Sequence, residues 1–332
     1  MIHAQTRTPT NAGIEEGFSP ELRAFWRHFP DKGLFLTLLA AWLVLFHVIG
    51  NGTFGYVDNA SIFGWMAKVY NAEGSEDNFC NFIPLLVLGL LWVKRKELLA
   101  QPLNTWWPGI LAVAGGLLFH AVGYILQQPR ASIVGFFVGL YGLMGLTWGP
   151  RFLRATFFPF FLFVFMVPFG SIATPVTFRL QLVVTKIVAF LCHDIFGLSV
   201  ARNGTQLINS VRHYHYEVAA ACGGIRSLIS IGLLSVIYGF TVFPATWQRL
   251  LLMACAIPLA LLGNTIRLLI IVLTAESRGQ TAGMAAHDSA IWSTIPYVAA
   301  IAGFLLVGYW METRMTAKSK PDITISEQSA SA

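Results

Sequence analysis

The chain has 332 residues, of which 55% are hydrophobic and only 11% are charged, with a mean hydropathy of +0.63 and a formal net charge of +6. Soluble domains carry about a quarter charged residues, so this composition excludes a soluble globular protein and indicates an integral membrane protein. The positive charge does not indicate a nucleic-acid-binding protein, because the basic residues lie in short loops between apolar runs, as is typical of membrane proteins.

Eight apolar runs are candidates for transmembrane helices, which need about 20 mostly apolar residues each. They cover residues 33–50, 79–93, 107–126, 131–148, 152–170, 219–243, 249–274 and 289–311. A ninth stretch, residues 171–196, is also apolar but contains Arg179, Lys186 and Asp194. We predict that it lies on the membrane surface or re-enters the membrane; crossing the membrane is the alternative. The predicted fold is therefore an all-α polytopic membrane bundle of about eight transmembrane helices plus one interfacial or re-entrant helix.

The distribution of charge along the chain predicts its orientation. Basic residues follow the second run at Lys94–Lys96, and others flank the first, fifth, seventh and last runs. The loop between the first two runs is instead acidic. The positive-inside rule then predicts a multi-pass protein of the plasma (inner) membrane, with both termini cytoplasmic and with loops 51–78, 171–218 and 275–288 facing outward. The sequence leaves open whether residues 197–218 form a small hairpin lid.

The same features predict a simple domain organisation. Residues 1–32 form a polar cytoplasmic lead, residues 33–311 the membrane domain, and residues 312–332 a disordered cytoplasmic tail rich in polar and small residues.

This topology brings three reactive groups to the outer side of the membrane: Cys222, Arg267 and His287. A thiol at the start of a helix is activated as a nucleophile, because the helix dipole and a neighbouring cation favour the thiolate. A histidine can take the thiol proton and return it to a leaving amine, and an arginine stays charged at any relevant pH. Gly223 and Gly224 leave room for a peptide backbone, and their N–H groups can face an oxyanion.

Simpler interpretations exist for several of these residues. Buried cysteines are usually small core hydrophobes, which is how we interpret Cys192 and Cys255. Cys80 also lies near the outer side, so a disulfide with Cys222 is an alternative in an oxidising compartment. A single membrane arginine such as Arg267 often only extends its charge to the lipid headgroups. The histidines have no ligand framework around them, so we expect neither a metal ion nor another cofactor.

Three short motifs resemble the exosortase/archaeosortase family over residues 77–292. They are "AACGGIRSL" around Cys222, "NTIRLL" with Asn264 and Arg267, and "HDSAIW" beginning at His287. The resemblance implies that Cys222 is the nucleophile, Arg267 the essential arginine and His287 the catalytic histidine. It assigns supporting or substrate-binding roles to Gly223, Gly224, Arg226 and Asn264. Gly223 departs from the family pattern, which usually has serine after the cysteine.

The resemblance implies a membrane-embedded cysteine transpeptidase or protease. It would cleave a C-terminal PEP-CTERM-like sorting signal at the outer membrane face through a thioester acyl-enzyme. Its partners would be membrane-anchored protein substrates and an acceptor, which is water, an amine, or a lipid or envelope component; nucleic acid is not expected. The alternative function is a non-catalytic component of exopolysaccharide export or assembly. A weaker alternative is a small-solute transporter in which Arg267 binds an anion.

Overall fold

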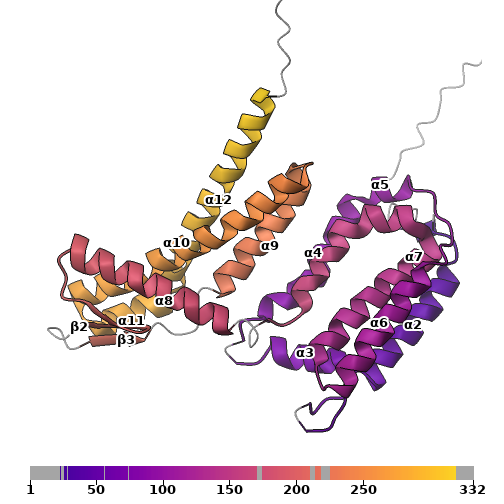
Figure 1. The fold of residues 1–332 in the computed structure, drawn as a ribbon, viewed down its shortest axis with the longest axis horizontal. Helices are drawn as coiled ribbons and strands as arrows, with labels where there is room; N and C mark the ends of the chain where they lie inside the picture. The colour runs from indigo at the N-terminus through magenta and orange to yellow at the C-terminus, as the bar shows by residue number, and fades with distance from the viewer. Residues whose placement is uncertain are drawn as a thin grey trace, which may run out of the picture. The chain divides into compact units, whose positions relative to one another are not determined.

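The computed structural model describes residues 29–55, 57–73, 75–169, 174–209, 214–217 and 225–318, together with residues 23, 26 and 27 (Figure 1). These residues are mostly helical, and they form two compact units. The first unit comprises the chain up to Lys68 and Asn81–Val167, and the second comprises Val69–Cys80 and the chain from Pro168 onward. Where the chain passes between the two units it forms α3 (Ile62–Tyr70) and η1 (Asn78–Phe82).

The first unit is built around a close helix pair. Its helices are α2 (Lys32–Val48), α4 (Ile83–Val93), α5 (Arg95–Leu99), α6 (Gly109–Ile125) and α7 (Pro129–Phe161), which continues into η2 (Leu162–Met166). Glycines let α6 and α7 approach closely, as small residues do in membrane bundles. A Cβ added at Gly116 would lie 2.6 Å from the carbonyl oxygen of Gly135 and 2.7 Å from the backbone nitrogen of Gly139.

The chain reverses direction within α7, at Gly149. This residue has φ 89° and ψ 172°, a conformation that side chains other than glycine hardly adopt. The two halves of α7 then pack antiparallel, because residues before the break meet residues after it in reverse order. Tyr141 donates a hydrogen bond to the carbonyl oxygen of Leu153 at 2.6 Å. Farther from the break, the ring of Phe137 stacks on that of Phe163 with centroids 4.5 Å apart.

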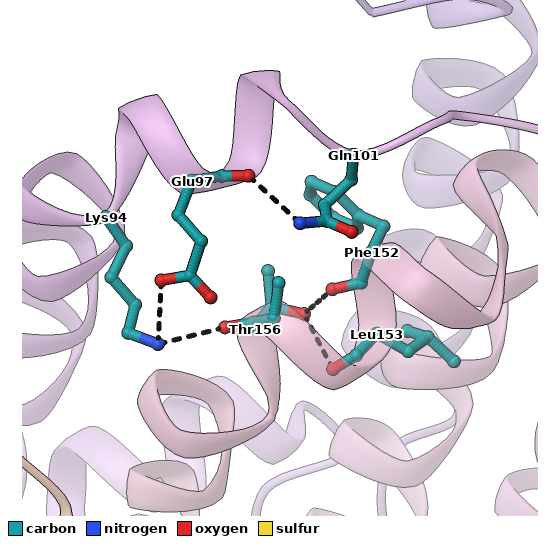
Figure 2. Close-up of polar contacts among 7 residues, drawn as sticks. Lys94, Glu97, Gln101, Phe152, Leu153 and Thr156 are labelled. Carbon is teal, nitrogen blue, oxygen red and sulfur yellow. Dashed lines mark hydrogen bonds and ion pairs between the residues drawn. The ribbon is translucent and has the colours of Figure 1, made fainter.

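The basic segment after α4 is attached to the second half of α7 (Figure 2). Lys94 Nζ donates to the carbonyl oxygen of Ala155 at 3.4 Å and lies 3.3 Å from a carboxyl oxygen of Glu97. Thr156 on the facing helix donates to the carbonyl oxygen of Phe152 at 2.9 Å, so its hydroxyl is satisfied within α7. The contact positions α5 across the beginning of the second half of α7.

The second unit surrounds the long helix α10 (Thr246–Arg278). Its other helices are α8 (Thr174–Phe190), continuing into η3 (Leu191–Ile195), α9 (Ile225–Val242), α11 (Gln280–Asp288) and α12 (Ala290–Lys318). The first part of α10 packs against α9 and α12 through Ile231, Leu252 and Phe304. The later part packs against α8 and a small sheet through Val188, Leu207, Leu268 and Val272 (Figure 1).

The sheet has three antiparallel strands, β1 (Ala201–Asn203), β2 (Gln206–Asn209) and β3 (Tyr214–Glu217), in the order β1-β2-β3. Leu207 on β2 faces the core with no exposed surface, opposite Arg202 on β1 and Tyr216 on β3. The strands lie within residues 197–218, the segment for which the sequence did not decide whether a hairpin forms. The all-α prediction missed this sheet, because its strands are only three or four residues long and have little periodicity to detect.

Each of the eight predicted apolar runs contains a helix, but eight membrane crossings are not confirmed. In the described part of the chain, three helical stretches are long and apolar enough to cross: Pro129–Met166, Pro175–Ile195 and Thr246–Arg278. Others, such as Lys32–Val48 and Gly109–Ile125, are shorter apolar helices. The second of the three lies in residues 171–196, which we predicted to be interfacial or re-entrant. Its length and composition therefore allow the crossing alternative.

Candidate active site

The structure locates the predicted site residues to different extents. Cys222, Gly223 and Gly224 lie outside the described residues. Arg226 is the second residue of α9, and His287 is the last but one of α11. For both residues the structure describes the backbone but not the side chain. Asn264 and Arg267 on α10 are described in full, so the geometry of the site is built from α10 and its neighbours.

Asn264 and Arg267 lie about one turn apart on α10, and both side chains are at least half-buried in the second unit. Asn264 is 6% exposed, and Arg267 is half-buried. The Nε of Arg267 is buried and makes no hydrogen bond to any residue that the structure describes. A buried polar nitrogen without an acceptor is costly, so such a group usually has a structural or functional explanation.

A second arginine on the same helix provides the contrast. Arg249, near the start of α10, donates from Nε to the carbonyl oxygen of Phe243 at 2.8 Å. Its guanidinium also stacks over the ring of Phe240, 4.5 Å from the centroid. Arg249 therefore stabilises the turn between α9 and α10, whereas the described structure offers no such role for the Nε of Arg267.

A hollow of about 540 Å³ lies between α10 and α11. Ile270 and Thr274 line it from α10, and they follow Arg267 by three and seven residues, which places all three on one face of the helix. Ala286 and Ser289 line it from the other side, and they bracket His287 in the sequence. The two candidate catalytic residues thus do not line the hollow themselves, but sequence neighbours of both line it.

The opposite side of α10 carries a polar contact that the sequence did not reveal. Asn209 on β2 donates from Nδ2 to Oε1 of Glu276 on α10, and the two side chains are 2% and 8% exposed. Glu276 follows Arg267 by nine residues, or two and a half turns, so the two side chains leave α10 in opposite directions. A carboxyl group two residues beyond the predicted apolar run 249–274 was the available signal.

The comparisons with known proteins agree with the motifs. The model of the transmembrane exosortase family (Exosortase_EpsH) matches residues 65–308, which is most of the chain. The chain belongs to this family. Exosortases act on substrates that carry sorting signals. No curated protein and no solved structure matches this exosortase. The match confirms the resemblance predicted over residues 77–292 and extends it at both ends.

The cysteines of this exosortase have different surroundings. Cys192 is fully buried among Val184, Val188 and Val272, which confirms the interpretation as a core residue. Cys255 is half-buried on α10. Cys80 carries a thiol rather than a disulfide and is hydrogen-bonded to the buried Tyr70. Among the described residues, no group of three His, Cys, Asp or Glu side chains is arranged to hold a metal ion.

Proposed function

We propose that this exosortase is a cysteine transpeptidase or protease that cleaves a C-terminal PEP-CTERM-like sorting signal. The observation that carries the proposal is the geometry around Arg267. Its Nε is buried without an acceptor in the described structure, and it shares an α10 face with residues that line a hollow, whose other wall includes Ala286 and Ser289. A buried arginine donor without an acceptor is available to bind an anionic group, such as the oxyanion of a reaction intermediate.

The proposed reaction begins with a substrate anchored by its own transmembrane helix, which presents the scissile peptide to the outer face. The Sγ of Cys222 attacks the carbonyl carbon while His287 takes the thiol proton. The carbonyl oxygen becomes an oxyanion, which Arg267 and the N–H groups of Gly223 and Gly224 stabilise. Asn264 and Arg226 support the site or contact the substrate.

Collapse of this intermediate breaks the C–N bond and forms a thioester on Cys222. The leaving amine receives the proton from His287 and departs with the anchor of the substrate. An acceptor then attacks the thioester and restores the thiol. Water as the acceptor yields a free carboxylate, and an amine on a lipid or envelope component yields a new amide. None of these steps requires a metal ion or another cofactor.

The location of the protein belongs to the same proposal. A multi-pass protein of the plasma membrane with both termini in the cytoplasm has loops 171–218 and 275–288 on the outer side. Segment 171–218 precedes α9, and segment 275–288 contains the end of α10 and all of α11. The proposed orientation therefore puts the reactive groups where a substrate anchored in the membrane arrives.

The first test compares wild type with Cys222→Ser and Cys222→Ala in cells that express a PEP-CTERM-like protein of the same genome. We expect the size shift of the substrate on a blot to disappear in both variants, while the enzyme stays in the membrane. Cys255→Ala, which removes a half-buried thiol of α10, is the control and should process normally. Unchanged processing in both Cys222 variants would contradict thiol chemistry and favour a non-catalytic role in exopolysaccharide export.

A further inference from the structure

The first unit contains a large apolar cavity, and none of the residues assigned to catalysis lines it. It measures about 730 Å³, within the range of roughly 300–1,000 Å³ that small-molecule sites occupy. Side chains from α2, α4 and α7 line it, including Phe35, Leu39, Val87, Leu91, Met144 and Phe160. Thr156 contributes a hydroxyl to the wall, but this hydroxyl is already bonded to carbonyl oxygens of α7. The wall therefore offers hydrocarbon contacts and little to hold water.

Aromatic side chains cluster in one part of the cavity wall, which forms one end of the cavity. Phe29 packs against Trp148 and Phe152, with ring centroids 4.8 and 5.5 Å apart, and all three line the cavity. Trp148 donates from Nε1 to the carbonyl oxygen of Pro30 at 3.3 Å. Tryptophan residues of membrane proteins concentrate at the level of the lipid headgroups. The aromatic end of the cavity is thus the end expected near the membrane surface.

Positive charge gathers at the same end. The guanidinium of Arg95 lies 4.6 Å from the centroid of Trp92, which lines the cavity. Lys94 contacts the chain beside Thr156 (Figure 2). Lys96 is exposed two residues farther along. Arg151 and Arg154 are exposed on the facing part of α7. An apolar cavity with basic residues beside its wall is complementary to a molecule with an apolar chain and an anionic head.

We infer that the first unit binds one anionic phospholipid, with an acyl chain in the cavity and the headgroup against Lys94–Lys96. Basic surfaces between transmembrane helices on the cytoplasmic side bind anionic headgroups, and the positive-inside rule places this end of the unit in the cytoplasm. The cavity lining includes none of Cys222, Arg267 and His287, so the inference does not depend on the proposed reaction.

Gly89 gives a way to fill the cavity without disturbing the fold. It lines the cavity from α4, and a Cβ added there would meet no atom within 4 Å. Glycine inside a helix is also less favourable than alanine by about 0.5–1 kcal/mol, so a side chain at this position does not oppose the helix. Gly115 on α6 is the matched control, because a Cβ there also meets nothing within 4 Å and the residue does not line the cavity.

The test is native mass spectrometry of the full purified chain with added phosphatidylglycerol or phosphatidylcholine. We expect wild type and Gly115→Phe to retain one phosphatidylglycerol and Gly89→Phe to lose it. If Gly89→Phe does not fold, retention of phosphatidylglycerol is measured instead with Gly89→Leu, which is a smaller replacement. Equal retention of phosphatidylglycerol by wild type and a folded Gly89 variant would overturn the inference, and so would its absence from wild type.

The headgroup is tested by removing charge. Arg95→Gln combined with Lys96→Gln should lower the preference for phosphatidylglycerol over phosphatidylcholine about fivefold for each charge removed. Arg314→Gln is the control, since Arg314 also stacks over a tryptophan, Trp310, at 5.6 Å but lies on α12 in the second unit. Equal binding of the two lipids by wild type would overturn the inference that the site selects an anionic headgroup. Loss of binding in Cys222→Ala would contradict the independence of the two sites.

Discussion

Asn209 and Glu276 form a buried hydrogen bond that attaches the small sheet to α10, although 67 residues separate them along the chain. The contact lies beside the apolar cluster of Val200, Leu207 and Leu268, so polar and apolar contacts act on the same interface. It positions the sheet on the side of α10 that points away from Arg267. The same stretch of α10 therefore sets the position of the sheet on one side and of the candidate catalytic arginine on the other.

Removing one partner of this bond should destabilise the second unit. Asn209→Ala or Glu276→Ala removes a buried hydrogen bond to a carboxyl group, which costs about 1–3 kcal/mol. The measurement is thermal unfolding in detergent, where both variants should melt below wild type and the double variant should cost less than the sum of the two. Gln206→Ala, a half-buried residue of the same strand, is the control. Strictly additive losses would show that the two side chains do not stabilise each other.

Arg267 should be needed for processing even where its charge is kept. Arg267→Lys retains a cation but removes the Nε donor and the planar fork, so we expect processing to fall by about 100-fold or more, as for an oxyanion donor. Arg249→Lys on the same helix loses the hydrogen bond to Phe243 and should lower the melting temperature while processing continues. The readout is substrate cleavage per amount of folded enzyme. Normal cleavage by Arg267→Lys would contradict the proposed role of the guanidinium.

Two adjacent glycines of α6 should respond differently to the same substitution. Gly116→Ala forces a methyl group to within 2.6 Å of the Gly135 carbonyl oxygen, and overpacking of this kind costs about 1–3 kcal/mol. Gly115→Ala adds the same methyl group in open space and should be neutral or stabilise by about 0.5–1 kcal/mol. Melting temperatures of the two variants in one detergent make the comparison. A larger loss for Gly115→Ala would refute the close approach of α6 and α7.

The stability of the second unit should fall at alkaline pH through Tyr70. Burial raises the pKa of this phenol, and the nearby Cys80 and Asp77 raise it further. The folded chain then keeps the proton that the unfolded chain releases near pH 10, so stability is complete below about pH 10 and falls above it by up to about 1.4 kcal/mol per pH unit. Tyr70→Phe should flatten this fall in melting temperature between pH 9 and 11. Tyr309→Phe, at a residue that is 65% exposed, should leave it unchanged.

Much of the fold followed from local sequence patterns. Apolar runs predict helices in a membrane protein because a backbone surrounded by lipid must satisfy its hydrogen bonds internally. The break between the predicted runs 131–148 and 152–170 falls at Gly149 in the structure. The membership of the family also followed from the short motifs around Cys222, Arg267 and His287, and the family match confirmed it.

By itself, the sequence determined that this protein is a helical membrane protein and which residues are candidates for its chemistry, since both depend on composition and short motifs. Only the tertiary structure decided that Asn209 meets Glu276, that Arg267 shares a helix face with the hollow beside α11, and that Gly89 opens into a cavity. These relationships join segments that are far apart in the chain or depend on the space between helices. Packing creates them, and no local pattern records them.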